Sequence, residues 1–251
     1  MADVPADVRV GVSGWRYRDW RGRFYPPGLV QRRELEYVAG LLNSVELNGS
    51  FYSLQRPASY QHWAASVPDD FLFAVKGGRY ITHLKRLVGV DVALANFFAS
   101  GLLALGDKLG PVLWQLPERF RRDVPRLAAA LDLLPPGRHC FEFRHESWFT
   151  DDVLSILRAF GAALVYGDHP QRPWQPLELT TDWTFVRFHY GRGRRGNYSE
   201  SELRELAPRV AELAEAGDTF AYYNNDWEGF AVANAKRLRR LLAAEGVRSR
   251  A

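Results

Sequence analysis

Three short apolar stretches of the chain carry a charged or amide side chain at every second position. They are Val45–Asn48, Phe141–Arg144 and Val186–His189. Side chains on a strand alternate between its two faces, so the two polar residues of each stretch share one face. A charge that points into a protein interior is costly unless it is paired or hydrogen-bonded. Six polar side chains on strand faces therefore indicate a site. They are Glu46, Asn48, Glu142, Arg144, Arg187 and His189.

Cations set the chemistry that such a site could do. Arg144, Arg187 and Lys76, which ends another apolar stretch, would repel one another unless carboxylates or an anionic ligand offset them. A guanidinium offers two parallel donors to a phosphate or carboxylate group. The set predicts a pocket for a small anionic ligand that bears a phosphate. The alternative is an internal salt-bridge network that only braces the protein.

Acid/base chemistry is the second property of this set. Glu142 and His189 are the first candidates for general acid/base catalysis, because the neighbouring cations can tune their pKa values. Glu46 is the third candidate catalytic residue, and with Asn48 and Asn224 it would orient the substrate. Hydrolysis of a phosphoester is the reaction that these residue types favour, and whether the protein is an enzyme stays open.

Strand and helix patterns alternate along almost the whole chain. Short apolar stretches predict eight strands, at residues 8–13, 44–48, 71–76, 111–115, 139–144, 162–166, 184–189 and 219–224. Helical spacing predicts helices at residues 31–42, 57–66, 91–105, 124–134, 152–160, 199–216 and 230–244. A capping box at Ser199 and Glu202 begins one helix, which Pro208 should kink. Residues 168–182 carry three prolines and no helical period.

These repeated units predict an α/β fold, a TIM-type (β/α)₈ barrel. The expected barrel is one domain over residues 1–251, with its core at about 8–242, because about 250 residues is the usual size of this fold. A doubly wound open sheet is the rival architecture. That sheet normally carries a glycine-rich turn after its first strand, and Ser13–Arg16 lacks the glycine spacing.

In a barrel the active site lies at the carboxyl ends of the strands. The predicted ends bring a polar or aromatic group from every strand to one rim. In strand order they are Ser13 and Trp15; Glu46 and Asn48; Lys76; Gln115; Glu142 and Arg144; Asp168; Arg187 and His189; Asn224 and Asn225. We therefore expect Trp15, Gln115, Asp168, Asn224 and Asn225 to contact the ligand as well.

A metal site and glycoside hydrolysis are alternative chemistries. A metal could be ligated from separate strand ends by His83, His145, Asp168, His189, Glu46 and Glu142, but no short motif such as HExxH is present. A divalent metal is thus an option that the sequence does not favour, and the cofactor stays unknown. Paired carboxylates also suit a glycosidase. Against a glycosidase, the fourth and seventh predicted strands end in Gln115 and His189, where many barrel glycosidases have their two acidic residues.

Nucleic-acid binding without catalysis is the alternative function. The net charge is +4 and the isoelectric point is near 9.3, a small excess beside a true polybasic domain. Arginines and aromatic residues interleave in Trp15–Tyr25, as in proteins that stack bases while tracking phosphates. The loop Gly191–Gly196 could bring backbone amides or arginines to a phosphate. Packing of the same rings over the barrel is the structural alternative.

The chain has the features of a cytoplasmic protein. No apolar run approaches the length of a membrane span, so we expect no membrane partner. The start, Met1–Asp7, lacks the layout of a signal peptide. The single cysteine, Cys140, fits a reducing compartment and is expected to be an inert core thiol. The oligomeric state is left open.

Seven motifs occur in a recognisable order. They are Gly11–Trp15, Val45–Asn48 with Phe51–Tyr52, Phe73–Lys76 with Ile81–His83, Gln115–Pro117, Glu142–Trp148, Arg187–His189 and Tyr223–Asp226. Together they resemble the YecE-like family, catalogued as domain of unknown function 72, from about Val8 to Leu242. The resemblance implies a TIM-type barrel with no settled activity, and it adds His145 and Trp148 to the strand-end residues. The chain departs from the family pattern at Gly49–Ser50 and at Glu228, where a histidine is common.

Overall fold

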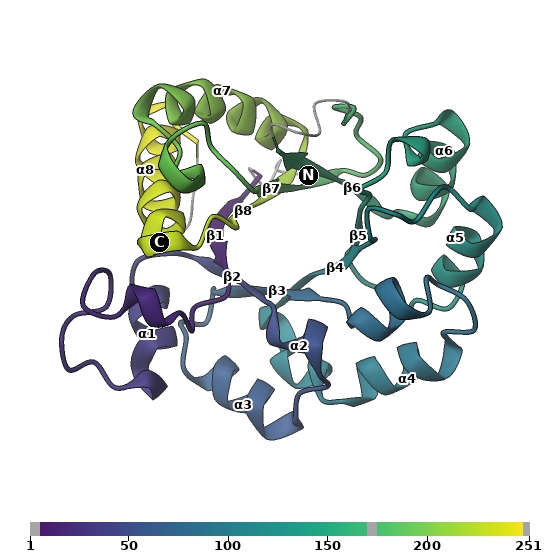
Figure 1. Ribbon diagram of the computed structural model, residues 1–251, viewed down its shortest axis with the longest axis horizontal. Coiled ribbons are helices and arrows are strands. Elements are labelled where there is room, and N and C mark those ends of the chain that lie inside the picture. The colour runs from purple at the N-terminus through teal and green to yellow at the C-terminus, as the bar shows by residue number, and fades with distance from the viewer. Residues whose placement is uncertain (1–5, 170–174, 248–251) are drawn as a thin grey trace, which may run out of the picture.

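The computed structural model describes residues 6–169 and 175–247, in which eight parallel strands close into a barrel (Figure 1). The strands are β1 (Val8–Ser13), β2 (Ser44–Leu47), β3 (Leu72–Lys76), β4 (Leu109–Gln115), β5 (His139–Glu142), β6 (Ala163–Asp168), β7 (Trp183–Phe188) and β8 (Asp218–Tyr223). Each strand pairs with the next one in sequence, and β8 closes the ring on β1. The predicted TIM-type barrel is confirmed. The first residues of the predicted start, 1–5, and residues 170–174 of the irregular stretch lie outside the described residues.

Helices surround the ring of strands (Figure 1). They are α1 (Glu34–Ala39), α2 (Gly49–Tyr52), α3 (Pro57–Ala65), α4 (Asp91–Ala99), α5 (Val124–Leu131), α6 (Asp151–Phe160), α7 (Glu200–Ala216) and α8 (Phe230–Ala244). The capping box at Ser199 and Glu202 is present. The helix predicted at 91–105 ends early, because Gly101 adopts a left-handed conformation with φ 109° and a 3₁₀ turn, Leu102–Lys108, follows. Helix α7 runs through Pro208 as one helical segment.

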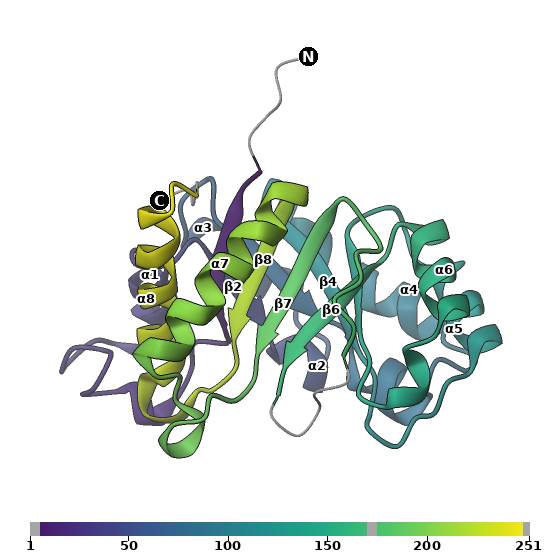
Figure 2. The same ribbon diagram turned by 90° about the horizontal axis from the view of Figure 1, so that it is seen from above.

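The carboxyl ends of the strands lie together at one end of the barrel, the lower end in Figure 2, beside α2. Two short elements at this end were not predicted. Helix α2 follows β2 directly, and a π-helical turn, Tyr80–Leu84, follows β3. None of the described helices is long and apolar enough to cross a membrane.

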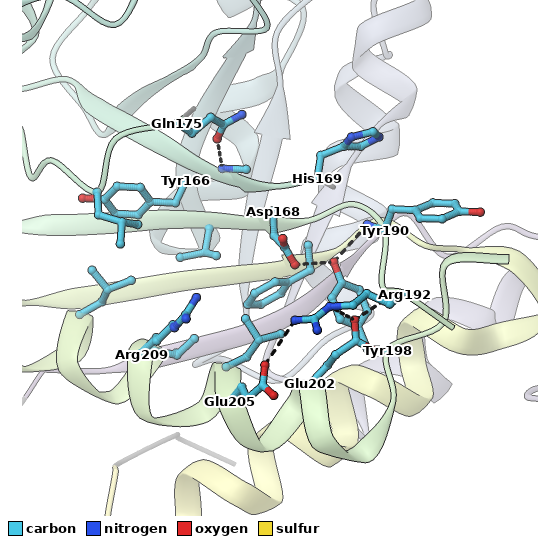
Figure 3. A pocket seen from close by; sticks show the side chains of 17 residues that line it. Tyr166, Asp168, His169, Gln175, Tyr190, Arg192, Tyr198, Glu202, Glu205 and Arg209 are labelled. Carbon is cyan, nitrogen blue, oxygen red and sulfur yellow. Dashed lines mark hydrogen bonds and ion pairs between the residues drawn. The ribbon is translucent and has the colours of Figure 1, made fainter. Parts of the chain in front are cut away.

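One connection differs from the others. Between β6 and β7 the described residues, 169 and 175–182, contain no helix, whereas a helix follows every other strand. The outer faces of these two strands therefore contribute to a cavity of about 460 Å³ beside α7, the outer pocket (Figure 3). Val186 and Phe188 from β7, and Leu206 and Val210 from α7, are among the residues that line it.

The inside of the barrel has two layers. Side chains at the carboxyl ends of the strands are polar, and those deeper in the barrel are mostly apolar. The apolar part is a separate cluster of Ala74, Leu113, Cys140, Ala163, Val165, Trp183, Phe185, Phe220 and Tyr222. Tyr222 on β8 passes Gly11 of β1 and contacts Ser44 on β2, with 2.6 Å between the two hydroxyl oxygens. Burial raises the pKa of the Cys140 thiol well above its usual value. Cys140 is thus a core side chain. The apolar layer packs against the polar side chains at the carboxyl ends of the strands.

A polar cluster and a cationic pocket at the mouth of the barrel

A single carboxylate joins most of the polar side chains that end the strands. Glu142, the last residue of β5, is buried and accepts four hydrogen bonds. Its Oε2 accepts from Nη1 of Arg187 at 2.6 Å and from Nε2 of Gln115 at 2.8 Å. Its Oε1 accepts from Nε of Arg144 at 3.0 Å and pairs with Nε2 of His189 at 2.9 Å. We call these five residues the Glu142 cluster.

The electrostatics of the cluster keep Glu142 ionised. Burial on its own raises the pKa of this carboxyl, but Arg144, Arg187 and His189 together hold it well below its usual value. Four donors also occupy the lone pairs of the two oxygens. A carboxylate so engaged is a weak proton acceptor. The geometry therefore favours a positioning role for Glu142 over the acid/base role expected from the sequence.

Arg187 lies beneath the mouth and bridges two glutamates. It is fully buried, and its Nη2 pairs with Oε1 of Glu46 at 2.8 Å, opposite the bond to Glu142. Burial lowers the pKa of the guanidinium, and the two glutamates more than offset that, so the pKa is raised overall. Each terminal nitrogen of Arg187 pairs with a carboxylate, so the side chain holds strands of the barrel together. This arrangement does not support the ligand contact expected for Arg187.

His189 is held as a neutral ring. Its Nε2 lies against Glu142, and Nδ2 of Asn224 lies 3.1 Å from its Nδ1. Burial lowers the pKa of His189 to about 4 despite the glutamate. An ionised carboxylate can only accept, and the amide nitrogen can only donate. The ring is therefore protonated on Nε2 and accepts at Nδ1, so neither nitrogen is free for a substrate.

A second layer of residues lies above this cluster and lines a cavity of about 820 Å³, the mouth pocket. Its cations are Arg16, Lys76, Arg79 and Arg144, and its aromatic walls are Trp15, Tyr17, Phe51, Tyr52 and Trp63. Asn48, Gln115, Asn224, His83 and Asp226 supply further polar groups. Of the predicted site residues, Trp15, Asn48, Lys76, Gln115, Arg144 and Asn224 therefore share one cavity. Sequence reasoning missed Arg79, Phe51 and Asp226 as site residues.

Three of these cations, Arg16, Lys76 and Arg79, have no carboxylate partner among the described residues. Lys76 ends β3, and its ammonium lies over the ring of Phe51, 4.4 Å from the ring centre. Burial and the charge of Arg187 lower the pKa of Lys76 to about 8, against the attraction of Glu46 and Glu142. Arg79, at the start of the π-helical turn, is exposed at the rim. The pocket consequently has an uncompensated positive charge.

Asp226 is the one carboxylate that lines the mouth pocket within the described part of the chain. Its Oδ2 accepts a hydrogen bond from the Tyr17 hydroxyl at 2.8 Å. Its Oδ1 is buried without a hydrogen-bond partner among the described residues, as are Oε2 of Glu46 and Oδ1 of Asn48. Burial, aided by the charge of Glu46, raises the pKa of Asp226 to about 7. This side chain can hold or release a proton near neutral pH.

We expect Asp226→Asn to stabilise the protein above neutral pH. The folded-state pKa of about 7 exceeds the ordinary value of 3.8, so the wild type loses stability as the pH rises between those values. Asparagine does not titrate and keeps an oxygen for Tyr17. Urea unfolding should show a gain for the variant that is about 1–3 kcal/mol larger at pH 8 than at pH 5. An equal difference at both pH values would contradict the raised pKa.

Two predicted site residues, Asp168 and Asn225, point away from the mouth pocket. Gly167, not Asp168, pairs with Arg187 across β6 and β7, so Asp168 points outward. It lines the outer pocket, where it accepts a hydrogen bond from the Tyr198 hydroxyl at 3.0 Å (Figure 3). Asn225 also points away from the mouth. Its Nδ2 donates to the carbonyl oxygen of Gly196 and to Oδ1 of Asn234, both at 2.9 Å.

The two residues added by the family resemblance hold the loop after β5. Nδ1 of His145 accepts from the backbone N–H of Ser147 at 3.1 Å. Trp148 is fully buried, stacks on Phe143 with 4.7 Å between ring centres, and donates from Nε1 to the Phe120 carbonyl at 2.6 Å. Neither residue lines the mouth pocket.

The two loops considered for nucleic acid are largely occupied by their own contacts. Trp20 and Tyr25 are buried and pack with the core, so they offer no stacking surface, whereas Trp15 lines the mouth pocket. Glu228 pairs with Arg194 and Arg195, at 2.6 and 2.7 Å, and also with Arg23. The amides of Gly191, Gly193 and Gly196 bond to carbonyls of the same loop. The glycine loop does not supply the amide cradle that its sequence suggested.

Within residues 6–169 and 175–247, no group of three or more histidine, cysteine, aspartate or glutamate side chains is placed to hold a metal ion. His83, His145 and Asp168, which the sequence offered as ligands, fall in three places. His83 lines the mouth pocket, His145 caps the loop after β5, and Asp168 lines the outer pocket.

Comparisons with known proteins agree on one family. Residues 9–251 match the sequence profile described as "Protein of unknown function DUF72". The UPF0759 protein YunF of Bacillus subtilis is 27% identical over 273 residues, which cover 95% of each chain. The crystal structure of a DUF72 family protein from Thermotoga maritima is 30% identical, with a TM-score of 0.85 over 94% of this chain and 99% of that one.

More distant structures share the architecture alone. D-psicose 3-epimerase of Clostridium cellulolyticum, solved with D-tagatose, is 11% identical, with a TM-score of 0.54 over 96% of this chain and 99% of that one. At this identity the similarity describes the barrel and carries no activity. The profile match and the full-length relatives show that the chain belongs to the DUF72 family, as its ordered motifs predicted.

Proposed function

We propose that the mouth pocket binds a small organic molecule that bears a phosphate group. The observation that carries this proposal is the charge of the lining. Arg16, Lys76, Arg79 and Arg144 line the cavity, and the only lining carboxylate in the described residues, Asp226, has a pKa of about 7. Converging cations in a concave site attract an anion and hold it through charge-assisted hydrogen bonds.

The shape of the pocket supports a small ligand with an organic part. A cavity of about 820 Å³ lies in the range of small-molecule sites. Trp15 and Phe51 offer ring surface on its wall, and Tyr52 stands exposed at its rim. Soluble phosphorylated metabolites have this combination of charge and carbon skeleton, and they are present in the cytoplasm, the compartment expected from the sequence.

Hydrolysis of a phosphoester stays part of the proposal as its reaction. Glu142 and His189 are engaged with one another and with their neighbours, so the proton acceptor that the geometry supports is Asp226. Its pKa is matched to proton transfer near neutral pH, and its Oδ1 has no partner among the described residues. Glu46 would then keep Arg187 in place.

The binding proposal is tested by titrating glycerol 3-phosphate into the wild type and Arg79→Gln by calorimetry. Arg79 is exposed and has no ion pair in the described part of the chain, so the substitution should leave the fold intact. Loss of one charge-assisted contact should weaken binding by about 10–100-fold. Arg192→Gln is the matched control. Arg192 lies outside the mouth pocket, so this variant should bind glycerol 3-phosphate with the affinity of the wild type. Equal affinities for all three proteins would refute the proposal.

Binding of nucleic acid without catalysis remains the alternative function. It predicts affinity for short single-stranded oligonucleotides that falls steeply with salt and does not depend on Arg79. The burial of Trp20 and Tyr25 and the ion pairs of Glu228 speak against it. The same three proteins, titrated with an oligonucleotide, separate the two functions.

A further inference from the structure

The chain has only four lysines, and Lys76, Lys85 and Lys108 differ sharply in their surroundings. Lys108 is engaged, donating to the carbonyl oxygens of Ala64 and Val67 at 2.8 and 2.9 Å. Lys85 is exposed near the ring of Tyr80. Lys76 is partly buried in the mouth pocket and pairs with no carboxylate among the described residues. It is therefore an amine held at a site without a structural partner.

Two features of its surroundings favour the uncharged form of this amine. The first is burial against the face of Phe51, which removes water from one side. The second is repulsion by the Arg187 and Arg144 guanidinium groups. The charges of Glu46 and Glu142 act in the opposite direction and do not outweigh these two effects. Desolvation next to other cations is how enzymes activate lysine as a nucleophile.

The effect on reactivity near neutral pH is large. An amine with a pKa of about 8 is roughly one-quarter unprotonated at pH 7.5, whereas one with the usual value is unprotonated about once in a thousand molecules. Only the unprotonated amine attacks a carbonyl carbon. Lys76 consequently has far more of the reactive form than an ordinary surface lysine.

We propose that Lys76 is a nucleophile that forms an imine with the carbonyl group of a phosphorylated aldehyde or ketone held in the mouth pocket. The inference rests on the proposed function, because the phosphate is what brings the carbonyl to the amine. It narrows the ligand class from phosphate esters in general to those with an aldehyde or ketone. Arg79 and Arg144, which line the same cavity, are the cations that hold the phosphate.

The step balances without any other reactant. The nitrogen lone pair of Lys76 attacks the carbonyl carbon, the C=O electron pair moves to the oxygen, and one proton passes from the nitrogen to the oxygen to give a carbinolamine. The hydroxyl then leaves as water with a proton that replaces the second one released by the nitrogen, while the nitrogen lone pair forms the C=N bond. One amine and one carbonyl compound give one imine and one water. Reduction of the C=N bond by added cyanoborohydride would make the link permanent.

The test is reductive trapping followed by peptide mass spectrometry on the full chain. The probe is glyceraldehyde 3-phosphate. Its two matched twins are glyceraldehyde, which has the carbonyl and no phosphate, and glycerol 3-phosphate, which has the phosphate and no carbonyl. At pH 7.5 we expect Lys76 to be labelled at least tenfold faster than Lys85 and Lys236. Glyceraldehyde should label Lys76 at least tenfold more slowly, and glycerol 3-phosphate should protect it.

Lys76→Arg keeps the positive charge and removes the nucleophile. In this variant labelling at position 76 should be lost, while that of the other lysines is unchanged. Normal binding of glycerol 3-phosphate with no preferred labelling of Lys76 would overturn the imine and leave the proposed function standing. Absence of glycerol 3-phosphate binding together with indiscriminate labelling would overturn both. Fast labelling by glyceraldehyde without protection would overturn the phosphorylated substrate class.

Discussion

Arg187→Met is expected to destabilise the protein by about 3–5 kcal/mol, the largest effect of any single substitution proposed for this chain. The guanidinium is fully buried and holds Glu46 at 2.8 Å and Glu142 at 2.6 Å. Methionine fills much of the same space but leaves two buried carboxylates without their shared cation. An uncompensated buried charge costs far more than the loss of the pair itself.

The measurement is urea unfolding at pH 7.5, followed by circular dichroism, with Arg158→Met as the matched control. Arg158 pairs with Glu178 at 3.0 Å on the surface, and such exposed pairs contribute about 0–1 kcal/mol. If Arg187→Met does not fold, Arg187→Lys supplies the measurement, because it keeps the charge and loses the fork that reaches both carboxylates. A cost for Arg187→Lys no greater than that of Arg158→Met would show that Arg187 does not brace the barrel.

Acidification is expected to have the second largest effect, through His189 and Glu142. The folded-state pKa of His189 is about 4 against an ordinary 6.5, so its contribution to stability is complete above pH 6.5 and is lost as the pH falls towards 4. Each pH unit in this window costs up to about 1.4 kcal/mol. Glu142, whose pKa is lowered well below 4.5, adds to the loss below that pH with the same sign.

Unfolding free energies at pH 7, 5.5 and 4.5 check this expectation. His189→Gln should be less stable than the wild type at pH 7, because it loses the fitted ring, but its stability should fall less between pH 6.5 and 4.5. Glutamine can still donate to Glu142 and has no proton to gain. Parallel stability curves for the two proteins would mean that His189 does not set the acid limit.

The elements of the fold could be predicted because their signals are local. Strand β1 and helix α8 begin and end at the predicted residues, since alternation and helical spacing act over a few neighbours. The helix predicted at 91–105 was too long. Gly101 stops α4 through a backbone conformation that spacing alone does not reveal.

The candidate site could be predicted only where the sequence showed clearly which alternate residues of a strand face the inside of the barrel. Alternation placed Glu142 and Arg187 on the inner face of the barrel, as the structure has them. At β6 and in the turn after β8, the last polar residue was taken as inward, and a slip of one residue moves a side chain to the opposite face. This is why Asp168 and Asn225 were assigned to the mouth.

Contacts between distant parts of the chain explain what the sequence could not predict. Arg187 meets carboxylates 45 and 141 positions away, and no local pattern distinguishes such a brace from a free cation that binds a ligand. Arg79 and Asp226 lie in turns, where neither alternation nor helical spacing applies. The charge of the mouth pocket therefore emerged only when the strands were closed into a ring.

The most direct measurement of the central claim is a crystal structure grown with tungstate, a phosphate analogue that anomalous scattering locates without ambiguity. The account predicts a tungstate ion in the mouth pocket, within hydrogen-bond distance of at least two of Lys76, Arg79 and Arg144. Tungstate bound only at Arg192–Arg195, or at the outer pocket, with none in the mouth pocket, would contradict it.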